Sequence, residues 1–173
     1  LEVLGKGAYG QVYKCVGEDE NMYAVKKSVD FESLVRDICI QSCIDSIFVV
    51  PIIDVGVYTP SDKDDKFFGN QNVYYVILPM GFGDMSRINI TTKSEIKKNF
   101  LYYMVQAVKE CHNTSIIHQD IKPANFIYFK SEHRHFEGKS PTTKVPIIKL
   151  TDFGIAKIKA CNENPNNDVY TLW

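Results

Sequence analysis

Glycines in a fixed spacing near the start of the chain constrain its fold more than any other feature. The segment Gly5-Lys-Gly-Ala-Tyr-Gly-Gln-Val12 fits Gly-x-Gly-x-x-Gly-x-Val, and strand-forming residues follow it directly. A dinucleotide-binding unit needs a helix at that point, and a Walker-type loop needs Gly-Lys-Ser/Thr, which is absent. The segment therefore predicts a strand–turn–strand flap whose missing side chains let it lie close over nucleotide phosphates.

The first 80 residues predict a small antiparallel sheet with one helix. Strand patterns cover residues 1–14, 23–26, 48–57 and 73–80, which gives about five strands. Apolar residues at helical spacing within residues 31–44 predict a short helix. A polar segment between the last two strand patterns is interpreted as an exposed loop.

The second half is richer in helix. One apolar face, formed by Ile96, Phe100, Met104, Ala107, Val108 and Cys111, predicts a longer helix over residues 94–111. Short strands are expected at 126–129 and 147–150. The polar insertion 130–144 between them is interpreted as a solvated loop, with docking of a partner as the alternative.

Composition excludes several classes of protein. Twenty basic against 21 acidic side chains leave a net charge of -1, so no general attraction to nucleic acid or to a membrane surface is expected. No apolar run is long enough for a membrane span and no signal peptide is recognised, which predicts an intracellular protein. Five cysteines without a Cys-x-x-Cys pair argue against a disulfide framework or a zinc site. Cys39 and Cys43 are interpreted as core residues.

Three further patterns carry chemistry. Lys26 ends a strand pattern at a distance from which an ammonium group can reach phosphates beneath the flap, although a solvated surface lysine is the alternative. The loop His118-Gln-Asp-Ile-Lys-Pro-Ala-Asn125 offers a carboxylate for a hydroxyl proton, an ammonium for phosphate charge and an amide oxygen for a magnesium ion. Asp152-Phe-Gly154 follows a strand and offers a second hard oxygen ligand.

Together and in this order, the four patterns resemble those of eukaryotic-type serine/threonine protein kinases, and within these they are most similar to the cyclin-dependent kinase-like group. The resemblance implies an α+β, two-lobed fold: residues 1–80 would be the ATP-binding lobe with its five-stranded sheet and one helix. Residues 81–173 would be part of the helical lobe, cut off before a Pro-Glu motif. It also implies transfer of the γ-phosphoryl group of MgATP to protein substrates.

Roles are carried over position by position. The resemblance makes Asp120 the catalytic base, Lys122 the γ-phosphate contact, and Lys26 the α/β-phosphate anchor. Asn125 and Asp152 would bind Mg²⁺. The Lys-Pro-Ala-Asn order resembles the serine/threonine form of the loop.

The resemblance also implies an ATP-binding set. Adenine would be sandwiched by aliphatic side chains, with Leu78 gating the rear of the pocket and Asp84 contacting ribose or, alternatively, capping a chain reversal. The implied ATP-binding residues are Leu4, Gly5, Lys6, Gly7, Ala8, Tyr9, Gly10, Gln11, Val12, Ala24, Lys26, Leu78, Pro79, Met80, Gly81 and Asp84. Tyr9 is either a site of inhibitory phosphorylation or a stacking aromatic.

The chain departs from the family at two positions. No glutamate stands where the helix should pair with Lys26, so Asp37 is the predicted substitute, with a solvated helix residue as the alternative. Gln119 replaces the usual arginine, and residues 155–169 contain no Ser or Thr, so activity is expected not to require phosphorylation of that loop. A pseudokinase or regulatory module without turnover is the alternative function, and a cyclin-like or other activating partner is left open.

Overall fold

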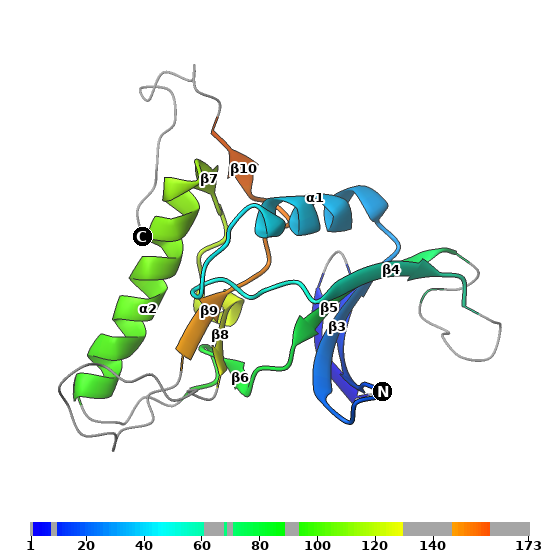
Figure 1. The fold of residues 1–173 in the computed structure, drawn as a ribbon, viewed down its shortest axis with the longest axis horizontal. Helices are drawn as coiled ribbons and strands as arrows, with labels where there is room; N and C mark the ends of the chain where they lie inside the picture. Colours follow the sequence, from blue (N-terminus) through cyan, green and yellow to red (C-terminus); the bar gives the residue numbers. More distant parts are fainter. Residues whose placement is uncertain are drawn as a thin grey trace.

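The structure, a computed structural model, describes residues 2–7, 10–60, 68, 71–88, 94–129 and 147–159. Figure 1 shows a twisted sheet at one side of the molecule and a long helix at the other, with a shorter helix above the region between them. The predicted positions Ala8 and Tyr9, the insertion 130–144 and residues 160–173 lie outside the described residues.

Five antiparallel strands form the sheet, in the order β1-β2-β3-β5-β4. Their bounds are Glu2–Gly7 for β1, Gly10–Val16 for β2, Met22–Ser28 for β3, Asp54–Tyr58 for β4 and Val73–Pro79 for β5. The helix α1 (Phe31–Ser42) connects β3 to β4 and packs against β5. The five-stranded sheet with one helix confirms the fold expected for the first part of the chain.

The sequence of α1 explains both its start and its buried face. Asp30 caps the helix, because its side chain accepts a hydrogen bond of 3.1 Å from the backbone N–H of Ser33. Leu34, Asp37 and Gln41 are buried. Two polar side chains of α1, those of Asp37 and Gln41, therefore point into the interior, where both require hydrogen-bond partners.

The segment after α1 differs from the prediction. A strand was expected over residues 48–57, but β4 begins only at Asp54. The earlier residues contact the second half instead: Val49 forms a parallel bridge with Leu150, and the N–H of Val50 donates to the carbonyl of Leu150 at 2.9 Å. Pro51 has no N–H to donate, which disfavours continuing the ladder of β4 towards the amino terminus.

The second half contains one long helix and short strands. The helix α2 (Ser94–Asn113) and the strands β8 (Phe126–Phe129) and β9 (Ile147–Leu150) occupy the predicted positions. Three two-residue strands, β6 (Gly83–Asp84), β7 (Ile116–Ile117) and β10 (Lys157–Ile158), have no sequence signal of their own. β6 pairs with β8, and β10 pairs with β7, so each belongs to a short antiparallel pair.

The main core joins the two halves. Residues from α1 and the loop after it pack with α2, β7, β8 and β9: Ile40, Ile44, Val49, Phe100, Ala107, Cys111, Ile116, Phe126, Ile148, Leu150 and Phe153. The interpretation of Cys39 and Cys43 as core residues is wrong, because both are exposed, Cys39 on α1 and Cys43 at its C-cap. They lie one helical turn apart on the side that faces away from the core. The division of the chain into two lobes near residue 80 stays a prediction.

Candidate active site

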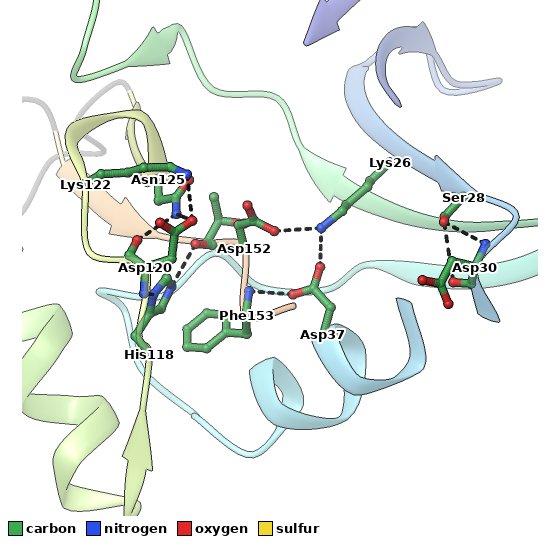
Figure 2. A network of polar contacts seen from close by, with 11 residues as sticks. Lys26, Ser28, Asp30, Asp37, His118, Asp120, Lys122, Asn125, Asp152 and Phe153 are labelled. Carbon is green, nitrogen blue, oxygen red and sulfur yellow. Dashed lines mark hydrogen bonds and ion pairs between the residues drawn. The ribbon is translucent and has the colours of Figure 1, made fainter. Parts of the chain in front are cut away.

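Lys26 projects from β3 with its ammonium group between two carboxylates (Figure 2). Its Nζ lies 2.5 Å from Oδ2 of Asp37 and 2.8 Å from Oδ1 of Asp152. Burial lowers the pKa of Lys26, but the two carboxylates raise it by more, so the pKa ends above its ordinary value and the ammonium stays charged. With its side chain only 19% exposed, Lys26 is not a solvated surface lysine.

Asp37 ties α1 to two other segments. One of its oxygens pairs with Lys26, and the other accepts a hydrogen bond of 2.7 Å from the backbone N–H of Phe153. The residue is only 4% exposed, so it is not a solvated helix residue. A carboxylate that binds both partners holds α1, β3 and the segment after β9 in one arrangement.

The loop between β7 and β8 carries a second polar cluster, visible in Figure 2. Lys122 Nζ lies 2.6 Å from Asp120 Oδ2, and Asn125 Nδ2 donates to the carbonyl of Asp120 at 2.8 Å and to its Oδ2 at 3.0 Å. Burial raises the pKa of Asp120, but the hydrogen bonds from Lys122 and Asn125 lower it by more, so the net shift is downward. Asp120 is therefore an ionised acceptor at neutral pH.

His118 fastens this loop to the segment after β9. Its Nδ1 accepts from the N–H of Asp120 at 3.2 Å, which leaves the proton on Nε2, 3.1 Å from the carbonyl of Thr151. The ring also meets Phe153 edge-on, with 4.7 Å between the ring centroids. Burial lowers the pKa of His118 below its ordinary value despite nearby carboxylates, so the ring is neutral.

Two residues of the site have backbone conformations that side chains rarely adopt. Gln119 has φ 63° and Asp152 has φ 70°, both in the left-handed region. Such conformations cost about 1–3 kcal/mol and persist only where the surroundings enforce them, typically at functional sites. They occur here next to Asp120 and at Asp152, the two carboxylates predicted to act on one ligand.

The glycine flap is formed by the hairpin β1–β2, in which Gly7 pairs with Gly10. Gly10 has φ +154°, and a Cβ there would lie 2.1 Å from the carbonyl oxygen of Lys27, so glycine is required by the close approach of β3. Lys6 is exposed. Gln11 is buried and accepts a hydrogen bond of 2.6 Å from the hydroxyl of Tyr13, on the opposite face of the sheet from Lys26. Only the backbone of Gln11 could therefore contact a nucleotide on the Lys26 face.

The residues predicted to surround adenine share one face of the sheet. Val12 pairs with Lys26 and Ala24 pairs with Leu78, and directly paired residues of neighbouring strands point to the same side. Leu4 lies where the β1–β2 register shifts, a bulge that turns the strand locally. Pro79 ends β5, and Met80 and Gly81 follow it.

Ile127 belongs beside these residues, and sequence reasoning missed it. A Cβ on Gly81 would lie 2.2 Å from Cγ2 of Ile127, so this β8 side chain lies directly against the segment after β5. The sequence held part of the signal, because residues 126–129 were predicted as a strand and neighbouring residues of a strand point to opposite faces. What it lacked was any indication that β8 runs beneath Gly81.

Asp84 is occupied by local partners. Its Oδ1 accepts from the backbone N–H of Ser86 at 2.9 Å and from the Ser86 hydroxyl, while Oδ2 lies 3.2 Å from Nε of Arg87. This is the geometry of a cap at a chain reversal, the alternative that the sequence left open. Contact with a ribose would require Asp84 to exchange these partners.

The donor set fits a magnesium ion held jointly with phosphates. Asn125 uses its amide nitrogen on Asp120, which leaves its Oδ1 as an acceptor, and the side chain of Asp152 is 45% exposed with one oxygen on Lys26. Within the described ranges, no group of three or more His, Cys, Asp or Glu side chains could hold a metal ion. Mg²⁺ prefers oxygen ligands, and it is commonly held by one or two protein oxygens while phosphate and water supply the remaining ligands.

Comparison with known proteins places the chain in a family. All of residues 1–173 match the protein kinase domain family. The chain is 28% identical over 180 residues to the probable serine/threonine-protein kinase mps1 of Dictyostelium discoideum, covering 96% of this chain and 16% of that protein. It is 26% identical over 184 residues to Cyclin-dependent kinase-like 1 of Caenorhabditis elegans, covering 100% of this chain and 45% of that protein.

A third relative, Mitogen-activated protein kinase 5 of Arabidopsis thaliana, is 25% identical over 181 residues, with 100% of this chain and 43% of that protein covered. The chain thus spans less than half the length of each of these curated relatives. Among the described residues, no helix is long and apolar enough to cross a membrane. Because the family match runs from end to end and the sheet, helix and charged loop follow the expected order, this chain belongs to the protein kinase family.

Proposed function

We propose that the protein transfers the γ-phosphoryl group of ATP to serine or threonine hydroxyls of protein substrates. The observation that carries this proposal is the single polar network of Figure 2, in which Lys26, Asp37 and Asp152 adjoin the loop of Asp120, Lys122 and Asn125. Phosphoryl transfer needs positioned charges around a triphosphate more than it needs covalent chemistry. This network supplies such charges.

The nucleotide would bind between the sheet and the second half of the chain. Lys26 would hold the α- and β-phosphates, while the backbone of residues 5–12 covers them. Adenine would lie between Val12 and Ala24 on one side and Ile127 on the other, with Leu78 at the rear. The carbonyl of Pro79 and both backbone groups of Gly81 would serve as its hydrogen-bond partners.

Asn125 and Asp152 would hold Mg²⁺. The ion would neutralise charge on the phosphate oxygens when bound. In this arrangement Lys26 keeps Asp152 in place from one side, and Asp37 keeps Lys26 in place from the other.

The remaining chemistry falls to the loop. Asp120, ionised because its pKa is lowered, would accept the proton of the incoming hydroxyl. Lys122 is half exposed and pairs with Asp120, so it can move to meet the negative charge of a γ-phosphate. His118 would position Asp120 through its backbone N–H.

Regulation is proposed to differ from kinases that need a phosphorylated activation loop. Gln119 is exposed and uncharged where the family usually places an arginine, so this position offers no cation to a phosphate. Active protein should therefore carry no obligatory phosphate between residues 155 and 169. Mass mapping of active protein over residues 155–171, which include the hydroxyl groups of Tyr170 and Thr171, tests this, and an activity that disappears when a phosphate in that segment is removed would contradict it.

The direct test is transfer of labelled phosphate by the full protein. Asp120→Asn should lower kcat by a factor of about 10²–10⁴, the usual contribution of a positioned base, and Lys26→Met should also remove most activity. Asp54→Asn and Lys109→Met change exposed residues of the same types and should leave activity unchanged. Equal signal in all five proteins would reject enzymatic transfer; ATP binding with no transfer by native protein would favour the pseudokinase alternative.

Three further statements stay proposals. Residues 1–80 and 81–173 would act as the two lobes of the kinase domain. An activating partner, cyclin-like or otherwise, would act through α1, because that helix carries Asp37. The intracellular location also stays a prediction.

A further inference from the structure

A cavity outside the nucleotide site lies beyond the carboxyl end of α1. Its volume is about 310 Å³, and α1 and the loop after it form its walls. Its polar wall includes Gln41, Asp45 and Ser46, and its apolar wall includes Val50, Pro51 and Ile52. None of these residues has a role in the proposed phosphoryl transfer.

The electrostatic character of this cavity is negative. The last turn of α1 contains no basic residue, so nothing in that turn offsets the partial negative charge of the terminal carbonyl groups. Asp45 lies just beyond the helix end and is exposed, and it is the one ionisable residue among those that line the cavity. A cation would therefore be attracted and an anion repelled.

Gln41 provides an acceptor to which none of the described residues donates. The residue is 5% exposed, and its Nε2 donates to the carbonyl of Val50 at 2.6 Å. Within the described part of the chain, no N–H or O–H group donates to its Oε1. No side-chain nitrogen or oxygen there is both buried and without a partner, so Oε1 keeps some accessible surface, and Gln41 lines the cavity. A donor arriving there would meet an acceptor that folding has already largely desolvated.

We propose that this cavity binds an arginine side chain of a partner protein. The apolar wall suits an aliphatic stem, and the oxygens of Gln41 and Asp45 suit the charged head. A guanidinium group has five N–H donors in a fixed plane, so it can serve a carboxylate and an amide oxygen at once, whereas an ammonium group is a point charge. An apolar ligand would leave these oxygens unpaired.

Occupancy of the cavity would stabilise the position of α1. Gln41 joins the helix to Val50, and the N–H of Val50 in turn donates to Leu150, two residues before Asp152. A guanidinium group on Gln41 Oε1 would polarise the amide and strengthen its hydrogen bond to Val50. Because α1 also carries Asp37, the bound side chain should slow hydrogen exchange of the α1 amides.

The experiment uses the full protein with ¹³C-labelled isoleucine and valine methyl groups. N-acetyl-arginine amide is titrated, and N-acetyl-citrulline amide, which keeps the shape without the charge, serves as the matched ligand control. Saturable shifts of the Val50 and Ile52 methyl signals are expected, with citrulline and N-acetyl-lysine amides each binding at least about fivefold more weakly, the upper range for an exposed ion pair. No shift at tens of millimolar, or equal affinity for the arginine and citrulline amides, would overturn the proposal. Equal affinity for the lysine amide would overturn the assignment to a guanidinium group.

Variants of the protein complete the test. Asp45→Asn changes an exposed carboxylate and should weaken the arginine amide about fivefold with an unchanged melting temperature. Asp54→Asn changes an exposed aspartate that does not line the cavity and should leave the affinity unaltered. Equal affinities in the native protein and Asp45→Asn would show that the negative charge of this cavity is not what the ligand recognises.

Discussion

The carboxylate of Asp37 contacts two segments with a side chain one methylene shorter than the glutamate usual in the family. Both of its oxygens are used, one on Lys26 at 2.5 Å and one on Phe153 N at 2.7 Å, and the residue is 4% exposed. α1 is therefore already close enough for the shorter side chain. Restoring the family residue would add volume to a filled position.

Asp37→Glu is accordingly expected to harm the protein. The extra methylene should lower the free energy of unfolding by about 1–3 kcal/mol and reduce phosphoryl transfer, because α1 must shift or the new side chain must leave a preferred rotamer. Asp37→Asn, which leaves Lys26 with only Asp152, should cost about 3 kcal/mol. Denaturant unfolding and kcat measure both effects. Native stability and activity in Asp37→Glu would show that α1 is not fixed at this distance.

The neutral state of His118 predicts a pH dependence of stability. Burial holds its folded-state pKa below the value near 6.5 of an unfolded chain. Above that value both states are neutral; below it the unfolded chain binds a proton that the folded protein does not, so the free energy of unfolding falls until the folded pKa is reached. Between about pH 7.5 and about pH 5.5 the native protein should lose about 1 kcal/mol more than His118→Asn. Equal losses in the two proteins would contradict a buried neutral histidine.

At the scale of elements, the hairpin β1–β2 distinguishes its glycines. A Cβ at Gly10 would lie 2.1 Å from the carbonyl oxygen of Lys27, whereas a Cβ at Gly7 would meet no atom of the described residues closer than 3.9 Å. Gly10→Ala should lower the free energy of unfolding by at least about 2 kcal/mol, while Gly7→Ala should change it by less than about 0.5 kcal/mol. Denaturant unfolding in the absence of nucleotide measures these changes in stability separately from any change in ATP binding. Similar stabilities of the two variants would mean that β2 does not approach β3 as described.

How well sequence predicts an element here depends on whether its signal is local. The alternation and spacing within α1, β8 and β9 are contained in each segment, and their predicted positions match the structure. The two-residue strands β6, β7 and β10 are too short for a period and exist because partner strands lie beside them. The strand expected from residue 48 fails for the same reason: Val49 and Val50 are apolar because they meet Leu150, not because they extend β4.

The candidate site shows the same division. The motifs around Lys26, Asp120 and Asp152 are local patterns, each recognisable within its own segment. For this reason the sequence alone predicts these three residues as site residues. The contact of Asp37 with Phe153 spans 116 residues, and the position of Ile127 beneath Gly81 depends on how β8 is placed. Neither leaves a pattern within its own segment. The exposed Cys39 and Cys43 likewise could not be told from core residues by spacing alone.

At the scale of the whole molecule, the site depends on how the two halves are joined. α1 and the loop after it share the main core with α2, β8 and β9, and the bridge from Val49 to Leu150 lies next to the segment that carries Asp152. Lys26 comes from the sheet, whereas Asp152 and Asn125 come from the second half. The ion pair of Lys26 with Asp152 therefore reports on the relative placement of both halves.

The measurement that tests this arrangement most directly is the Mg²⁺ dependence of ATP affinity in the full protein, determined by calorimetry without a substrate protein. If Lys26, Asn125 and Asp152 share one metal-bound triphosphate, Mg²⁺ should tighten ATP binding by native protein. In Asp152→Asn, the factor by which Mg²⁺ increases ATP affinity should be at least about tenfold smaller than in native protein. In Asp54→Asn, this factor should be unchanged. An unchanged Mg²⁺ effect in Asp152→Asn would show that this carboxylate does not bind the metal of the nucleotide complex.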